Sequence, residues 1–192
     1  MSHFTSLTTE IRDLEVCKKA LENMGLKLQE YGKCRYYYGT EEMPNVVKLP
    51  TLYDMALEDN HNGSYSIRAD FFDGYVEDVI GRNGSILLRE YGEEIIKKTA
   101  KELHLSVTHP EKDVYKLRSP QDPNGGYMLV HFEENGEVRF QPKGIKGKNC
   151  SKFIGVEDAL GKITKREFLP EYYEKTGIKE KDKKERVKLG GY

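Results

Sequence analysis

The chain has 192 residues, a formal net charge of −1, 37% hydrophobic and 33% charged residues, 13 Tyr and no Trp. This composition fits one large or two small globular domains with a partly phenolic core, and the small net charge gives no indication of nucleic-acid binding by itself. No run approaches the roughly 20 apolar residues of a membrane helix, and the N-terminus has no signal-peptide pattern, so we expect the protein to stay in the compartment where it is made.

The cysteines and the charges are unevenly distributed. Cys17, Cys34 and Cys150 are widely spaced, odd in number and free of any CxxC pair. This spacing indicates a reducing compartment and no structural zinc, and we expect no metal or other cofactor. Residues 1–122 carry 16 Lys and Arg against 21 Asp and Glu, whereas residues 123–192 carry 15 against 11. An anionic partner would therefore bind the C-terminal part.

Residues 1–118 predict an α+β module, a ferredoxin-like antiparallel sheet with two helices. Helical spacing of apolar residues, with Asp13 as N-cap and Gly25 as end signal, predicts the first helix. Asn62-Gly63 predicts a hairpin turn. The other expected elements are strands over residues 4–11, 26–30, 33–39, 51–58, 65–71, 106–108 and 114–117, a break over 41–44, and a helix over 85–103.

A Pro-, Gly- and Ser-containing segment, residues 119–126, predicts a linker. Residues 127–173 follow as a smaller module, with a hairpin that turns at Asn135-Gly136 and a helix that ends at Gly161. This hairpin could extend the first sheet. Residues 174–192 carry mixed charges and few apolar side chains, which predicts a flexible charged tail.

The start of the chain resembles a known family. Met1-Ser2-His3-Phe4, Ile11-Arg12-Asp13-Leu14 and Ala20-Leu21-Glu22-Asn23-Met24-Gly25 are similar to the conserved hypothetical chloroplast reading frame family with a Met-Ser-His-Phe opening. The similarity extends to about Leu117. That family is found in cyanobacteria, red-algal plastids and other bacteria and is a domain of unknown function. The resemblance implies a cytoplasmic protein, or a stromal one if the chain is plastid-encoded.

A second resemblance covers the C-terminal part. Gly144-Ile145-Lys146-Gly147-Lys148-Asn149-Cys150, Ala159-Leu160-Gly161 and Pro170-Glu171-Tyr172-Tyr173 are similar to a small bacterial domain, also of unknown function, that is often encoded beside the first. The chain would then be a fusion of the two families. Neither implies catalytic residues. Members are often found near AAA+ ATPases, which implies such an ATPase as a partner.

Two features of the basic segment after residue 142 are candidate sites. Lys143, Gly144, Lys146, Gly147 and Lys148 form a loop before a predicted helix, where converging amides and cations could bind an anion or a partner. The loop has no P-loop or dinucleotide spacing, and a tight basic turn explains it equally. Cys150, at the predicted helix start, is either a reactive thiol with a lowered pKa or a small packed residue.

Two aromatic segments of the first module each have a functional and a structural interpretation. Tyr36, Tyr37 and Tyr38, flanked by Lys33 and Arg35, could form an aromatic interface with a protein or stack on bases. The net acidity of residues 1–122 disfavours nucleic acid. In Asp70-Phe71-Phe72-Asp73 the carboxylates are not expected to converge, and a turn explains them better than acid–base chemistry.

The residues therefore favour a non-catalytic binding or adaptor protein. It would present a sheet edge and the basic loop to a protein partner, for which an AAA+ ATPase is the candidate. Two alternatives remain open: a thiol-dependent redox sensor or enzyme that uses Cys150, and a nucleotide or nucleic-acid binder that uses the basic loop.

Overall fold

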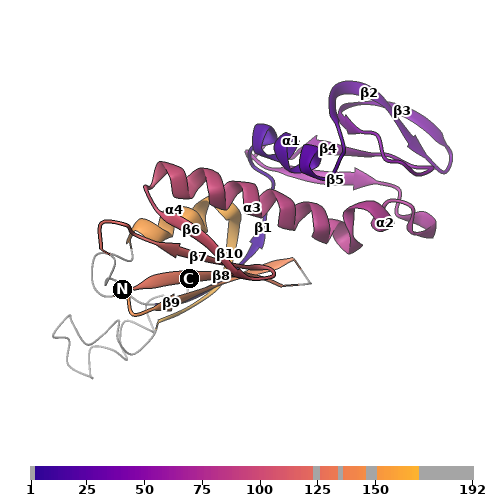
Figure 1. Ribbon diagram of the computed structural model, residues 1–192. Coiled ribbons are helices and arrows are strands. Elements are labelled where there is room, and N and C mark those ends of the chain that lie inside the picture. Colours follow the sequence, from indigo (N-terminus) through magenta and orange to yellow (C-terminus); the bar gives the residue numbers. More distant parts are fainter. Residues whose placement is uncertain (1–2, 123–125, 134–135, 146–150, 169–192) are drawn as a thin grey trace.

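The computed structural model describes residues 3–122, 126–133, 136–145 and 151–168, which form two antiparallel sheets and a set of helices (Figure 1). The mixed α+β class predicted from the sequence is confirmed. The elements in chain order are β1 His3–Thr9, α1 Leu14–Asn23, β2 Leu28–Tyr36, β3 Gly39–Val47, β4 Met55–Asp59, β5 Tyr65–Ala69, η1 Phe72–Gly74, α2 Glu77–Ile80, η2 Arg82–Gly84, α3 Ser85–Glu102, β6 Ser106–Glu111, β7 Val114–Arg118, β8 Tyr127–Phe132, β9 Glu137–Lys143, α4 Ser151–Leu160 and β10 Gly161–Phe168.

Helix α1 begins and ends where the sequence predicted. The Asp13 carboxylate accepts a hydrogen bond from the Val16 amide at 3.1 Å, and Gly25 follows the helix with a φ of +73°. Helix α3 fixes the same end, because the Tyr91 hydroxyl accepts hydrogen bonds from the amides of Arg12 and Asp13 at 3.0 and 3.1 Å. The N-terminus of α1 is thus held by its own cap and by α3.

Strands β2, β3, β4 and β5 form one sheet in that order, here called sheet B. The hairpin at Asn62-Gly63 is confirmed by the pairing of β4 with β5. The break predicted over residues 41–44 is wrong, because β3 runs through it and Pro44 pairs with Tyr31. Within β3, only Val46 and Val47 pair with β4, so Pro44 has a neighbouring strand on one side alone. A missing N–H is tolerated at such a position.

The second sheet, sheet A, has the order β10-β1-β9-β8-β7-β6. The N-terminal strand β1 lies between β9 and β10, and β7 pairs with β8 across the predicted linker. The ferredoxin-like arrangement is not confirmed, since strands of residues 1–118 are divided between the two sheets. The sequence analysis did not predict β10, and local patterns could not show that the two ends of the chain would pair.

Helices α3 and α4 pack on one face of sheet A, and α3 continues past it toward sheet B (Figure 1). One buried cluster includes residues of both predicted modules, among them Ile11, Tyr91, Phe140 and Leu160. Gly92 allows the close approach of α3, because a Cβ there would lie 2.5 Å from the ring of Phe132. No helix in the described part of the chain is long and apolar enough to cross a membrane.

Candidate functional site

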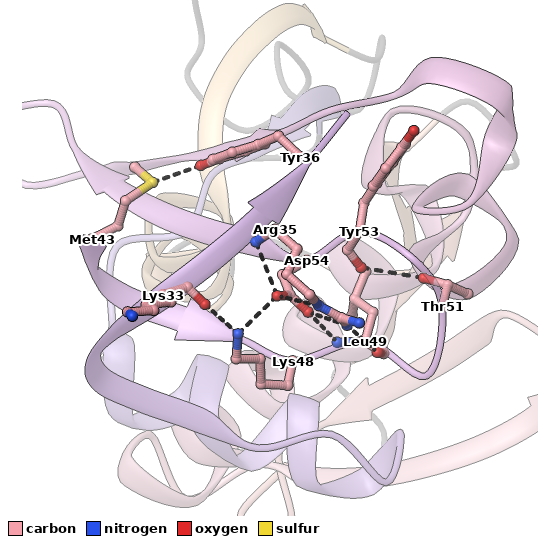
Figure 2. Close-up of polar contacts among 9 residues, drawn as sticks. All are labelled: Lys33, Arg35, Tyr36, Met43, Lys48, Leu49, Thr51, Tyr53 and Asp54. Carbon is pink, nitrogen blue, oxygen red and sulfur yellow. Dashed lines mark hydrogen bonds and ion pairs between the residues drawn. The ribbon is translucent and has the colours of Figure 1, made fainter. Parts of the chain in front are cut away.

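A buried carboxylate organises one end of sheet B (Figure 2). The Asp54 side chain has no exposed surface. Arg35 Nη2 donates a hydrogen bond to its Oδ1 at 2.6 Å, and Arg35 Nε donates to its Oδ2 at 2.8 Å. Lys48 Nζ lies 2.8 Å from Oδ2, and the amides of Arg35 and Leu49 donate at 3.0 and 3.2 Å. Five donors thus converge on one carboxylate, and two of their side chains carry a positive charge.

This arrangement keeps Asp54 ionised. Burial alone would raise the pKa of the carboxyl group, but hydrogen bonds from Arg35, Lys48 and the two amides outweigh burial and lower the pKa to about 2. Such a group cannot supply a proton at neutral pH, and donors already occupy both of its oxygens. Arg35 Nη2 also donates to the Leu49 carbonyl at 3.0 Å, and Lys48 Nζ donates to the Lys33 carbonyl. The network therefore ties residues 48–54 to strand β2.

The next residue, Tyr36, belongs to the interior of sheet B. Its hydroxyl donates a hydrogen bond to the sulfur of Met43 at 2.6 Å, and its half-buried ring packs on a small cluster formed by Cys34, Met43, Val46 and Ala56. Burial also raises the pKa of Tyr36, so the phenol stays protonated. Tyr36 therefore contributes to the packing of sheet B.

The two tyrosines that follow are exposed. Strand β2 ends at Tyr36, and Tyr37 and Tyr38 form the turn to β3. The Tyr37 ring lies 4.7 Å from the Tyr38 ring and 5.1 Å from that of Phe72. Residue exposures are 96% for Tyr38, 60% for Phe72 and 56% for Tyr37. These three rings form a contiguous surface, here called the aromatic patch.

One carboxylate holds the two segments of the patch together. Asp70 Oδ2 accepts from the Tyr37 amide at 2.9 Å, and Asp70 Oδ1 accepts from the Phe72 amide at 3.0 Å. The turn after β2 and the 3₁₀ turn η1 are therefore joined through the Asp70 side chain, which accepts a hydrogen bond from a backbone amide of each turn. The patch is displayed on an ordered backbone, which lowers the entropic cost of binding.

The sequence predicted part of this patch. Tyr36, Tyr37 and Tyr38 were all candidates. The structure places Tyr37 and Tyr38 in the patch, whereas Tyr36 ends strand β2 and is half-buried against the cluster of Cys34, Met43, Val46 and Ala56. Phe72 was missed. Asp70 and Asp73 were expected to form a turn, and the turn is present, but only the fold shows that Asp70 reaches Tyr37. The signal in the sequence that could have indicated Phe72 was a pair of Phe residues with an Asp on either side.

The basic loop lies largely outside the described residues. Lys143 ends strand β9 and is exposed, and Gly144 follows with a φ of +66°. Lys146, Gly147, Lys148 and Cys150 are not among the described residues, so anion binding and thiol reactivity there stay predictions.

The other two thiols are buried. Burial raises the pKa of Cys17 to about 12 and also raises that of Cys34, so neither is a reactive thiolate at neutral pH. Within the described ranges, no group of three or more His, Cys, Asp or Glu could hold a metal ion.

Comparison with known proteins gives one family match. The model of a family described as a protein of unknown function (DUF2997) matches residues 130–173, a span that includes the second half of β8 together with β9, α4 and β10. This match agrees with a small domain of unknown function in the C-terminal part. No curated protein matches the chain. The aromatic patch and the Asp54 network lie outside the matched span.

Proposed function

We propose that the protein is a non-catalytic binding or adaptor protein that docks a protein partner through the aromatic patch. The observation that carries this proposal is the contact among three exposed rings, Tyr37, Tyr38 and Phe72. Exposed aromatic side chains in contact are costly to leave in water and are typical anchors of protein interfaces.

The surroundings of the patch support a binding role. Asp70 orders the backbone at Tyr37 and Phe72, and the Asp54 network holds the end of β2 directly before the turn. A partner would meet a surface that is already in its bound shape, so less ordering would oppose binding.

The partner class that we propose is an AAA+ ATPase, in the cytoplasm or stroma. This choice rests on the resemblance of residues 1–117 to the chloroplast reading frame family and of the C-terminal part to a second small domain, since members of these families are often found near AAA+ ATPases. The basic loop from Lys143 onward would add a second contact to the same partner.

The test is affinity purification from the native host, followed by mass spectrometry. The bait proteins are the wild type, a Tyr38→Ser/Phe72→Ser variant, and Tyr31→Ser as a matched control. Tyr31 is 64% exposed on β2 and is not part of the patch. We expect one ATPase to be recovered with the wild type and with Tyr31→Ser, and to be lost with the double variant.

The recovered ATPase would then be purified, and its affinity for each variant measured by titration calorimetry. We expect the double variant to weaken binding at least tenfold, as for the loss of an aromatic anchor worth about 2 kcal/mol. Equal affinity of all three proteins for the ATPase would refute docking through the patch. Recovery of no ATPase would refute the partner class.

A further inference from the structure

The face of sheet A that lies opposite α3 and α4 has a composition of its own. On the helix side the strands present buried apolar residues, namely Tyr115, Leu117, Met128, Val130, Val138 and Phe140. The pleat turns the alternate residues to the other face. In β7, β8 and β9 these include Lys116, Arg118, Tyr127, Leu129, Arg139, Gln141 and Lys143, all at least partly exposed.

The register places the cations of this face in neighbouring rows. Arg118 pairs with Tyr127 and Tyr127 with Lys143, which makes one row across three strands. Lys116 pairs with Leu129 in the next row. Strand spacing puts Arg118 and Lys143 roughly 10 Å apart, and the two rows roughly 7 Å apart.

These cations are not neutralised by the described residues. Arg139 lies 3.4 Å from Glu133, but no carboxylate of the described chain is within ion-pair distance of Lys116, Arg118 or Lys143. Lys116 Nζ instead lies 4.1 Å from the centre of the Tyr127 ring, and the Arg118 guanidinium carbon lies 5.6 Å from it. The Tyr127 ring keeps the positive charges of Lys116 and Arg118 close together and does not neutralise them.

We propose that this surface, formed by Lys116, Arg118, Tyr127 and Lys143 and here called the basic sheet face, binds single-stranded nucleic acid. An extended strand offers phosphates at repeated intervals and flat bases, which match cations in rows beside an aromatic ring. A duplex is read by elements that enter its grooves, and a sheet face does not enter them in this way. An acidic protein segment would use the cations but not the ring.

The net charge of each part of the sequence does not reveal this surface. Residues 1–122 are net acidic, which disfavoured nucleic acid in the sequence, but Lys116 and Arg118 belong to that part and lie beside Lys143 of the basic part. Glu137 also lies on this face of β9, six residues from Lys143, at the opposite end of the strand. The positive potential is therefore concentrated in the rows of Lys116 and Arg118.

Fluorescence anisotropy would test the proposal with labelled oligo(U) and oligo(dT) of about 12 nucleotides, a length that one sheet face can hold. The full chain is compared with a Lys116→Glu/Arg118→Glu/Lys143→Glu variant. A matched control, Lys18→Glu/Lys27→Glu/Lys101→Glu, changes the net charge equally at exposed lysines outside the basic sheet face. Circular dichroism and urea unfolding establish that each variant is folded, and Lys116→Gln/Lys143→Gln serves as a milder variant.

We expect the wild type and the control to bind one or both oligonucleotides and the face variant to bind at least tenfold more weakly. Three phosphate contacts on a single strand change the slope of log affinity against log salt by about 2, so the face variant should have a slope shallower by that amount. Tyr127→Leu should weaken binding and leave the slope nearly unchanged, because it removes only stacking.

Three results would overturn the proposal. One is no binding to either oligonucleotide by the wild type at about 0.05 M salt. Another is an equal loss of oligonucleotide affinity in the face variant and in the control, which would indicate that the oligonucleotides are attracted by net charge alone. The third is tighter binding to poly-aspartate than to either oligonucleotide, which would make the face a site for acidic protein. Preference for oligo(U) over oligo(dT), or the reverse, tells which nucleic acid the face accepts.

Discussion

The Asp54 network and the aromatic patch are adjacent along β2 and the turn that follows it. Charged groups usually stay exposed and aromatic rings are usually buried, but here the carboxylate is buried and the rings are exposed. Asp54 carries a charge into the interior, whereas the rings of Tyr37 and Tyr38 are left in water. The buried carboxylate accepts hydrogen bonds on both oxygens, so its burial is tolerated, whereas more than half of the surface of Tyr37, Tyr38 and Phe72 is exposed. The first arrangement is built for stability, and the second is costly unless a partner covers it.

The largest expected effect comes from removing the carboxylate of the network. Asp54→Ala leaves the charges of Arg35 and Lys48 and two amides without their acceptor. We expect a loss of about 3–5 kcal/mol in the free energy of unfolding, measured by urea denaturation. The exposed residue Glu30 on β2 is a matched control, and Glu30→Ala should change the stability by less than about 0.5 kcal/mol. A similar small change for Asp54→Ala would mean that the network contributes little.

Acid should reveal the same network without a mutation. The folded pKa of Asp54, about 2, lies below the ordinary aspartate value of 3.8, so the contribution of Asp54 to stability is present above the unfolded pKa and is lost as the pH falls toward the folded pKa. Between about pH 4 and pH 2, protonation of Asp54 should lower the free energy of unfolding by about 2 kcal/mol. Asp54→Asn cannot titrate, and its unfolding free energy should fall less steeply over that range. Parallel pH profiles would contradict the lowered pKa.

Neighbouring tyrosines should separate the two regions further. Tyr36→Ala removes a half-buried ring and its hydrogen bond to Met43, and we expect a loss of about 1–2 kcal/mol. Tyr38→Ala removes a ring that is almost fully in water and should cost less than about 0.5 kcal/mol. Urea midpoints of the two variants give the comparison directly. Equal losses would place Tyr38 in the core of the protein, against the structure.

The sequence predicted what local patterns determine. The cap at Asp13, the hairpin at Asn62-Gly63 and the helix over 85–103 depend on residues close in the chain, and the structure has them. The pairing of β1 with β9 and β10 joins segments more than 120 residues apart, and no local pattern encodes it. The same limit applies to the sites. Tyr37 and Tyr38 could be named from the sequence, but Phe72 and the basic sheet face depend on which strands and turns become neighbours.

Asp70 should contribute little to stability, and there the sharper measurement is local order. Asp70→Ala frees the amides of Tyr37 and Phe72, which lie at the surface and can bond to water, so we expect a loss below about 1 kcal/mol. Both amides should exchange faster with solvent in NMR hydrogen exchange, because the two turns are no longer joined.

Asp59 offers a matched control for this local effect, since its carboxylate accepts from the His61 amide at 2.7 Å in a different turn. Asp59→Ala should speed exchange at His61 and leave Tyr37 and Phe72 unchanged. If Asp70→Ala leaves exchange at Tyr37 and Phe72 unchanged, the turns keep their order without Asp70. If exchange rises and the affinity for the partner falls while the rings remain, the ordered backbone itself contributes to binding, and the patch is more than three exposed rings.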